Sequence, residues 1–268
     1  MVQTNQYLAM RRFIRPLLYS LFRIRGQIPD TAHTLQRDAS LYWAASAGND
    51  NLKDLSHWRG YGRWSDDTAW LGIGENNLFS VEQLIVLSGR TRPLGSVLEW
   101  GPGGGSNAIA LRSRCQFYYG VDISAANLAE CGRQLRGCGF SNFHPILIDP
   151  TKAQQTMQAC RSLPAIDLFL STACFQHFPS KEFGAMVLQI ASSVLADDGL
   201  AVIQIRYDDG SKSVRQKYGA YFQNAITFTS YKIEAFWQLL SENGLMPLAV
   251  TLFPETHYAT YLAKKRVD

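Results

Sequence analysis

Glycines crowd the end of one apolar run in this sequence. SVLEW (96–100) is followed by GPGGG (101–105), and small apolar residues with helical spacing come next. Glycines in such a turn let the chain reverse sharply, bring backbone N–H groups close to a ligand and pack the next helix closely on the strand. The following apolar run ends in Asp122, 17 residues beyond Gly105. A carboxylate there can accept hydrogen bonds from both ribose hydroxyls, so turn and acid together predict a nucleoside site.

A phosphate-binding loop is the obvious alternative for a glycine-rich turn. No Lys-Ser or Lys-Thr pair follows these glycines, and Glu99 stands just before them. A carboxylate in that place would repel a pyrophosphate, whereas a phosphate loop needs the lysine and the hydroxyl. The sequence therefore disfavours a nucleoside diphosphate as the ligand.

An alternation of strand and helix patterns must position these groups. Helical spacing predicts helices over 106–113, 125–139, 153–163, 181–198 and 231–244. Short β-rich runs lie before, between and after them, at 96–100, 116–122, 142–149, 166–172, 199–207, 246–253 and 258–265. Because only PETH separates the last two runs, they form an antiparallel hairpin. The pattern predicts an α/β, Rossmann-like, mostly parallel seven-stranded sheet that ends in this hairpin.

The first part of the chain has a different character. Residues 1–80 are polar, rich in tryptophan and poorly periodic, and they predict an N-terminal helical cap over the domain formed by residues 81–268. Within them, residues 8–25 interleave five arginines with apolar side chains, too many charges for a membrane span. This basic amphipathic segment predicts contact with an anionic membrane surface. Docking on its own domain or on a second copy in a homodimer is the alternative.

Composition excludes several classes of protein. The chain has 268 residues, of which 46% are hydrophobic and 18% charged, with a formal net charge of +4. These values are ordinary for a folded enzyme and give no indication of nucleic-acid binding. The five cysteines show no metal-binding spacing, so we expect reduced thiols, no zinc and a cytoplasmic protein, peripheral at most to the inner membrane surface.

Several motifs resemble those of class I S-adenosylmethionine-dependent methyltransferases. VLEWGPGGG (97–105) is similar to the first motif of that family, with Glu99 as its acid. YYGVDIS (118–124) resembles the second motif, and IDLFLSTACFQHFP (166–179) resembles the fourth motif of small-molecule members. VLADDGLAVIQI (194–205) resembles the helix, turn and strand that follow. The resemblance covers about residues 95–207 and implies S-adenosylmethionine as cofactor.

The resemblance also implies which residues bind that cofactor. Glu99 orients the amino end, Asp122 binds the ribose hydroxyls and Ile123 packs on the adenine. Asp149 lies near the adenine amino group, although Pro150 after it departs from the family pattern. The methionine part is flanked by Gly101, Gly103 and Gly105 and lined by Ser171 and Thr172. A plain capping or turn role is the alternative for Asp122, Asp149, Ser171 and Thr172.

His177 is the candidate catalytic residue. An activated methyl group needs a base only when the acceptor is a group such as a hydroxyl, and histidine titrates near neutrality. The alternative for His177 is a structural role, and His57 and His257 are weaker candidates. Asp208 and Asp209 follow the fifth strand, where metal-dependent members place ligands. Because Ser171 stands where such members need an acid, no metal is expected.

Aromatic and guanidinium groups predict where the acceptor binds. Such groups suit sugar rings or an anionic substrate, and the candidates are Arg59, Arg63, Trp64, Arg206 and Tyr207. The first part of the chain loosely resembles methyltransferases of bacterial polysaccharide or lipid-linked glycan assembly. We therefore expect O-methylation of a small-molecule or glycan acceptor. A natural-product N- or O-methyltransferase and a non-catalytic cofactor-binding partner subunit are the alternatives.

Overall fold

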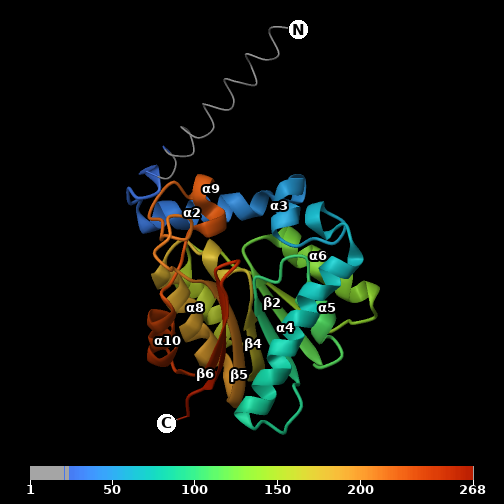
Figure 1. Cartoon of the computed structure of the whole chain (residues 1–268). Coiled ribbons are helices and arrows are strands. Elements are labelled where there is room, and N and C mark those ends of the chain that lie inside the picture. The colour runs from blue at the N-terminus through green and yellow to red at the C-terminus, as the bar shows by residue number, and fades with distance from the viewer. Residues whose placement is uncertain (1–20, 22–23, 268) are drawn as a thin grey trace.

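A seven-stranded sheet lies at the centre of the computed structural model, which describes residue 21 and residues 24–267 (Figure 1). Its strands run in the order β3-β2-β1-β4-β5-β7-β6. The first five are parallel, and β7 is antiparallel to both of its neighbours. The strands are β1 (Ser96–Trp100), β2 (Phe117–Asp122), β3 (Phe143–Leu147), β4 (Ile166–Ser171), β5 (Leu195–Arg206), β6 (Leu245–Phe253) and β7 (Tyr258–Lys265). The predicted fold and its final hairpin are confirmed.

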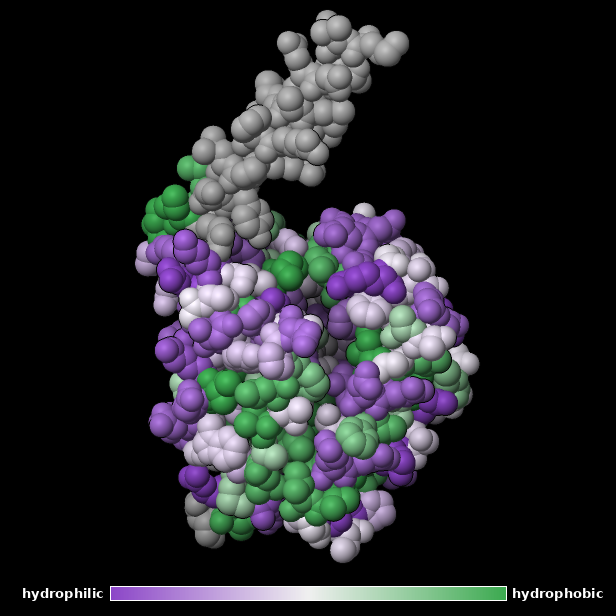
Figure 2. Space-filling model, viewed as in Figure 1, coloured by the Kyte–Doolittle hydropathy of each residue, from purple (hydrophilic) through white to green (hydrophobic). Residues whose placement is uncertain are grey.

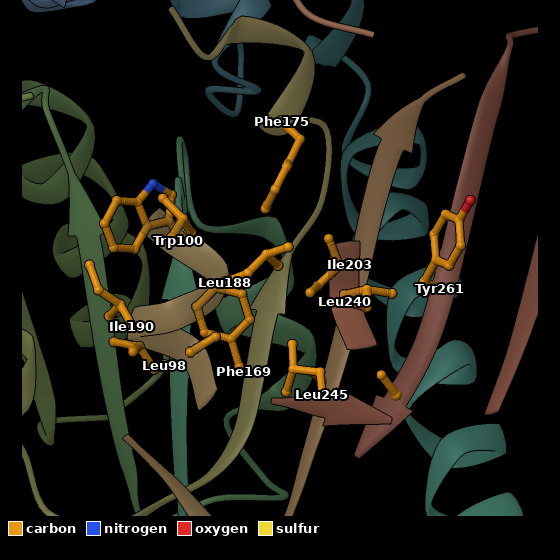
Figure 3. Packing of buried hydrophobic residues seen from close by; sticks show 14 of the residues in the cluster. Leu98, Trp100, Phe169, Phe175, Leu188, Ile190, Ile203, Leu240, Leu245 and Tyr261 are labelled. Atoms are coloured by element: carbon orange, nitrogen blue, oxygen red, sulfur yellow. The ribbon is translucent and has the colours of Figure 1, made fainter. Parts of the chain in front are cut away.

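Helices cover both faces of the sheet because successive strand residues point to opposite sides. In β4, Leu168 and Leu170 pack toward one face and Phe169 toward the other. The first face carries α4 (Asp67–Ser88), α5 (Ser106–Leu111) and α6 (Ala125–Gly137). The second face carries α7 (Ala153–Arg161), α8 (Lys181–Val194) and α10 (Ile233–Glu242), with Leu188, Leu240 and Tyr261 in its core (Figure 3).

One helix ends earlier than its pattern indicated. Helical spacing predicted a helix over 181–198, but α8 ends at Val194. Leu195 is extended and buried, and it pairs with Ile166 of β4. Burial and strand pairing of Leu195 outweigh the helical pattern of the next three residues. Strand β5 therefore begins at Leu195, four residues before Gly199, where the predicted strand began.

A second layer crosses one end of the sheet. We call residues 31–64 the cap segment, and they form α2 (Ala32–Ala44), η1 (Ala45–Gly48), α3 (Asp50–Leu55) and η2 (Gly62–Trp64). Figure 1 shows α2 and α3 along the end of the sheet beside α9 (Tyr221–Asn224). Leu35 and Ala39 of α2 pack with Tyr221, Ala225 and Phe228 in a separate apolar cluster. The cap segment therefore rests partly on residues near 220, which the sequence did not indicate.

Helix α4 crosses the residue at which the N-terminal cap was expected to end. It is continuous from Asp67 to Ser88, and it packs on α5, β5 and β7. The division of the chain at residue 80 into two domains stays a prediction. Of the predicted amphipathic segment 8–25, only Leu21, Ile24 and Arg25 are among the described residues. Within the described part of the chain, no helix has the length and apolar character needed to cross a membrane.

Candidate functional site

A pocket lies between the cap segment and the carboxyl ends of β1, β2 and β4. The space between these residues is about 820 Å³, part of it open to solvent. Figure 2 shows the surface hollowed below the cap segment. The strands and the glycine turn contribute one wall, and Trp43, Ser56 and His57 belong to the other. In parallel sheets ligands bind at this end of the strands.

The glycine turn faces both the pocket and the cap segment. Gly101, Gly103 and Gly105 have φ of 78°, 51° and 88°, a left-handed conformation that glycine adopts without strain. A Cβ on Gly103 would lie 2.4 Å from the Ser56 carbonyl oxygen. The Gly104 amide donates to that same oxygen at 2.7 Å. The turn therefore needs bare backbone in order to accept the cap segment, a reason that the motif alone did not indicate.

The three predicted glycines have different places in the site. Gly101 and Gly103 line the pocket. Gly105 lies outside the pocket wall and is the N-cap of α5, where a Cβ would come within 3.0 Å of the Cys131 Cα. The first two can lie beside a ligand, whereas Gly105 allows close packing of α5 on α6.

Glu99 is buried at the centre of a hydrogen-bond network. Its Oε1 accepts from Asn107 Nδ2 at 2.7 Å, and its Oε2 accepts from the Tyr118 hydroxyl at 2.5 Å. Burial raises the pKa of Glu99 to about 7, although these two hydrogen bonds lower it. Asn107 Oδ1 in turn accepts from Asn77 Nδ2 of α4 at 2.8 Å. Sequence analysis did not find either asparagine, although Asn107 stands in the first turn after the glycines.

The hydroxyl of Thr172 is oriented by the same network. Its oxygen accepts from Asn107 Nδ2 at 2.9 Å and from Asn77 Nδ2 at 3.3 Å. A hydroxyl has two acceptor sites and one proton, so this O–H group is left to donate toward the pocket that Thr172 lines. Ser171 has a different role, because it is fully buried and donates to the Trp100 carbonyl at 3.0 Å.

Asp122 presents a buried carboxylate to the pocket. Its Oδ1 accepts from the Ser124 amide at 2.8 Å, and its Oδ2 accepts from Asn127 Nδ2 at 3.4 Å. Burial raises the pKa of Asp122 to about 6, against the effect of these hydrogen bonds. Ile123 lines the pocket beside it. Both residues thus line the pocket, and their predicted contacts with ribose and adenine stay predictions.

Asp149 lies outside the pocket wall, which its neighbour Pro150 joins. The Asp149 side chain is 40% exposed and lies 3.4 Å from Lys152 Nζ. Its Oδ1 accepts from the Thr151 hydroxyl at 2.7 Å, and this bond, with the Thr151 amide and Lys152, keeps the pKa of Asp149 below its usual value. These contacts match the turn role that was its alternative.

The cap segment is fastened to the first turn of α6 beside Asp122. Ser46 and Ser124 share a buried hydrogen bond of 2.8 Å between their hydroxyls. Trp58 Nε1 donates to Asn127 Oδ1 at 2.9 Å, and Asn127 Nδ2 lies 3.4 Å from the Ser56 hydroxyl. Because Asn127 also donates to Asp122, it connects the carboxylate of the pocket to the cap segment.

His177, the predicted base, lies in the pocket wall on η3 (Phe175–His177). Its Nδ1 lies 2.9 Å from the Ala225 carbonyl, which can only accept, so Nδ1 carries the proton. Its Nε2 then accepts from Gln176 Nε2 at 3.2 Å. Burial lowers the pKa of His177 to about 4. The imidazole is therefore neutral near pH 7.

His57 of the cap segment also lines the pocket. Its backbone is left-handed, with φ of 57°, and Trp70 Nε1 fixes it by donating to the His57 carbonyl at 2.6 Å. Within the described residues its ring nitrogens have no hydrogen-bond partner, and the ring meets Trp64 edge-on at 4.8 Å. Burial lowers the pKa of His57 to about 4, and the charges of Arg63 and His177 add to this. Strained backbone of this kind clusters at functional sites.

His57 was the weaker candidate in the sequence, and its left-handed backbone is not visible there. The third candidate, His257, lies in the turn between β6 and β7, outside the pocket wall, with its Nδ1 3.2 Å from Asp209 Oδ2. Asp208 accepts from the Gly210 amide. Within the described residues, no group of three histidine, cysteine or acidic side chains is placed to hold a metal ion.

None of the five predicted substrate residues forms part of the pocket wall. Arg59 makes two hydrogen bonds of 2.6 Å to exposed Asp67. Tyr207 is buried, with its ring edge-on to His257 at 5.9 Å. Arg63 pairs with Asp54 at 3.3 Å, and Trp64 Nε1 donates to the Asp54 carbonyl at 2.6 Å.

Arg206 is the fifth of these residues. It is partly buried at the end of β5, and its guanidinium carbon lies 5.6 Å from the centroid of the Tyr258 ring. Its positive charge acts on His177, whose pKa is lowered mainly by burial and further by this charge. Arg206 is therefore close enough to His177 for its charge to act there, although it lies outside the pocket wall.

Comparison with known proteins identifies the class that this fold and site define. Residues 78–250 match a family described as a methyltransferase domain, and the chain belongs to that family. It is an S-adenosylmethionine-dependent methyltransferase of the Rossmann-like class. A search of curated proteins finds no match.

Solved structures show the same fold. An S-adenosylmethionine-dependent methyltransferase from Clostridium acetobutylicum aligns with a TM-score of 0.52 and 15% identity, over 70% of this chain and 89% of that one. A candidate sarcosine dimethylglycine methyltransferase from Galdieria sulphuraria aligns with a TM-score of 0.56 and 15% identity, over 75% and 88% of the two chains. At such identities the likeness establishes the fold alone.

The pocket residues fit S-adenosylmethionine by their own chemistry. Asp122 offers a buried carboxylate to hydroxyl donors, and Thr172 offers a proton to an acceptor such as a carboxylate. Glu99 faces the same pocket with a negative charge that a cation would stabilise, since burial holds its pKa at about 7. A nucleoside joined to an amino acid that carries a sulfonium matches this set of groups.

Proposed function

We propose that the protein methylates a hydroxyl group of a small-molecule or glycan acceptor. The observation that carries this proposal is the pair of partly buried, uncharged histidines, His57 and His177, in the wall of the same pocket as Asp122 and Thr172. A hydroxyl must lose a proton as it is methylated, and a neutral imidazole can take that proton.

Residue roles follow from the contacts. Asp122 accepts hydrogen bonds from ribose hydroxyls, and Ile123 supplies an apolar surface next to it. Glu99 attracts the amino group, and the Thr172 hydroxyl donates to the carboxylate. When bound, S-adenosylmethionine supplies an activated methyl group. The cap segment excludes water and holds the acceptor hydroxyl near the histidines.

The low pKa values of the histidines restrict how the proton moves. An imidazole with a pKa of about 4 has its lone pair available at neutral pH but is a weak base. It cannot ionise a hydroxyl in advance, so proton transfer accompanies methyl transfer. His177 Nε2 is already engaged by Gln176, whereas the His57 ring has no such partner within the described chain. His57 is therefore at least as suitable a base as His177.

The test is methyl transfer from radiolabelled S-adenosylmethionine to a panel of phenols, hydroxy acids, sugars and amines. We expect labelled methyl ethers from the hydroxyl acceptors. Labelling of amines alone, with all oxygen acceptors unchanged, would contradict O-methylation. It would favour the alternative of an N-methyltransferase, which needs no base.

We further propose that residues 8–25 contact an anionic membrane surface. Their five arginines and apolar residues support it. Co-sedimentation with vesicles rich in phosphatidylserine should retain the full chain more strongly than a chain lacking residues 1–26. Equal partitioning of the two chains would reject the contact.

A further inference from the structure

Three arginines predicted to bind substrate differ in whether a carboxylate neutralises them. Arg59 is paired with Asp67, and Arg63 is paired with Asp54. Arg206 has no carboxylate partner within the described residues, and its Nε is buried without a hydrogen-bond acceptor. A partly buried charge without a counter-charge is costly, so an anionic ligand would stabilise the Arg206 guanidinium.

Arg206 is connected to the pocket through a short series of side chains. Its guanidinium lies beside the Tyr258 ring, and the Tyr258 hydroxyl accepts from Gln176 Nε2 at 3.1 Å. The same Gln176 nitrogen lies 3.2 Å from His177 Nε2. A group bound at Arg206 would therefore be close to the histidine wall.

Two arginines from different elements place positive charge near Tyr258. Burial raises the pKa of the Tyr258 hydroxyl, and the charges of Arg206 on the sheet and Arg63 on the cap segment lower it. The nearby acids are already engaged, since Asp54 pairs with Arg63 and Asp209 contacts His257. The surroundings of Tyr258 are thus suited to an anion.

We propose that the methyl acceptor carries an anionic oxygen group, a carboxylate or a phosphate monoester, that is bound by Arg206 beside Tyr258. The two terminal nitrogens of a guanidinium present an end-on pair of N–H groups that matches two oxygens of either group, and the buried Nε takes no part. With its anion held there, the acceptor extends its hydroxyl toward His177 and His57. This inference rests on the proposed function and adds the substrate class to it.

Calorimetry on the protein saturated with S-adenosylhomocysteine tests the inference with benzoate, phenyl phosphate and neutral benzamide. We expect benzoate or phenyl phosphate to bind at least about tenfold more tightly than benzamide, as charge-assisted hydrogen bonds imply. Which of the two anions binds more tightly identifies the group. Arg206→Met should abolish the preference for the anion, and Arg206→Lys should restore part of it. Arg59→Met is the matched control and should leave the preference unchanged.

Two results would overturn the anion site. One is equal binding of benzamide and both anions, and the other is an anion preference that survives in Arg206→Met while that variant still binds S-adenosylhomocysteine. Failure of the proposed function has another signature, because it appears in the methyl-transfer panel. Arg206-dependent anion binding without oxygen methylation would refute O-methylation and retain the anion site.

Discussion

The two walls of the pocket are built in different ways. On the sheet side, Glu99 and Asp122 are at strand ends, and each accepts two hydrogen bonds from neighbouring elements. On the cap side, His57 stands on a left-handed backbone with a ring that has no hydrogen bond within the described residues. Groups that a hydrogen-bond network holds in place suit a ligand that is the same in every turnover. The difference is consistent with our proposal that the cofactor binds on the sheet side and that the acceptor lies near His57.

The histidine variants should show the largest effect. Asn tolerates the left-handed backbone at residue 57, so His57→Asn removes the imidazole without refolding the segment. We expect His57→Asn or His177→Asn to lower methyl transfer to a hydroxyl acceptor about 100-fold, with unchanged affinity for S-adenosylhomocysteine. His257→Asn is the matched control, because His257 is also left-handed, with φ of 55°, but lies outside the pocket wall. Wild-type rates in both pocket variants would remove the base from the mechanism.

A variant on the sheet side should change cofactor affinity, which the histidine variants leave unchanged. Asp122→Asn should weaken S-adenosylhomocysteine binding about 100-fold in calorimetry, because two hydrogen bonds to a charged acceptor are weakened. Asp149→Asn, outside the pocket wall, should change affinity little. If both variants bind like the wild type, the ribose assignment is wrong.

The pH dependence of S-adenosylhomocysteine binding also tests the role of Asp122. Asp122 has a pKa of about 6, so the wild-type affinity should fall as pH decreases below 6. Its pKa is raised on folding, so through this group acidification from pH 6 toward 4 stabilises the unliganded fold. Asp122→Asn should lose both of these contributions and keep the fall in affinity near pH 7 that protonation of Glu99 causes. A wild-type affinity that stays constant from pH 8 to 5 would contradict the role of Asp122.

The contact between the glycine turn and the cap segment should give the smallest effect, a change in stability. A Cβ on Gly104 would lie 2.2 Å from the His57 carbonyl oxygen. Gly104→Ala should therefore displace the cap segment and lower the free energy of unfolding by about 1–3 kcal/mol. Gly72→Ala is the matched control, since nothing lies within 4 Å of its added Cβ and alanine favours the helix. Equal stability of the two variants in urea would show that the glycine turn is not tightly packed against the cap segment.

Much of the sheet side could be predicted from the sequence. Strand periods, the glycine turn and Asp122 at the end of β2 are encoded within short stretches, and the family motifs are local too. The contribution of α9 to the cap could not be predicted, because Tyr221 packs with Leu35 across nearly 190 residues of chain. Patterns within short stretches of sequence do not indicate contacts between residues so far apart in the chain.

By itself, the sequence determined the fold class and the methyl donor, because these depend on the order of residues along single strands and turns. Only the tertiary structure decided which of the two pocket histidines has no ring hydrogen bond, and which of the three candidate arginines has no carboxylate partner, among the described residues. His57 and Arg206 stand 149 positions apart in the chain, and their partners come from other elements. Hydrogen bonds and ion pairs form between groups that are close in space, so the partners of a side chain are decided only when the chain has folded.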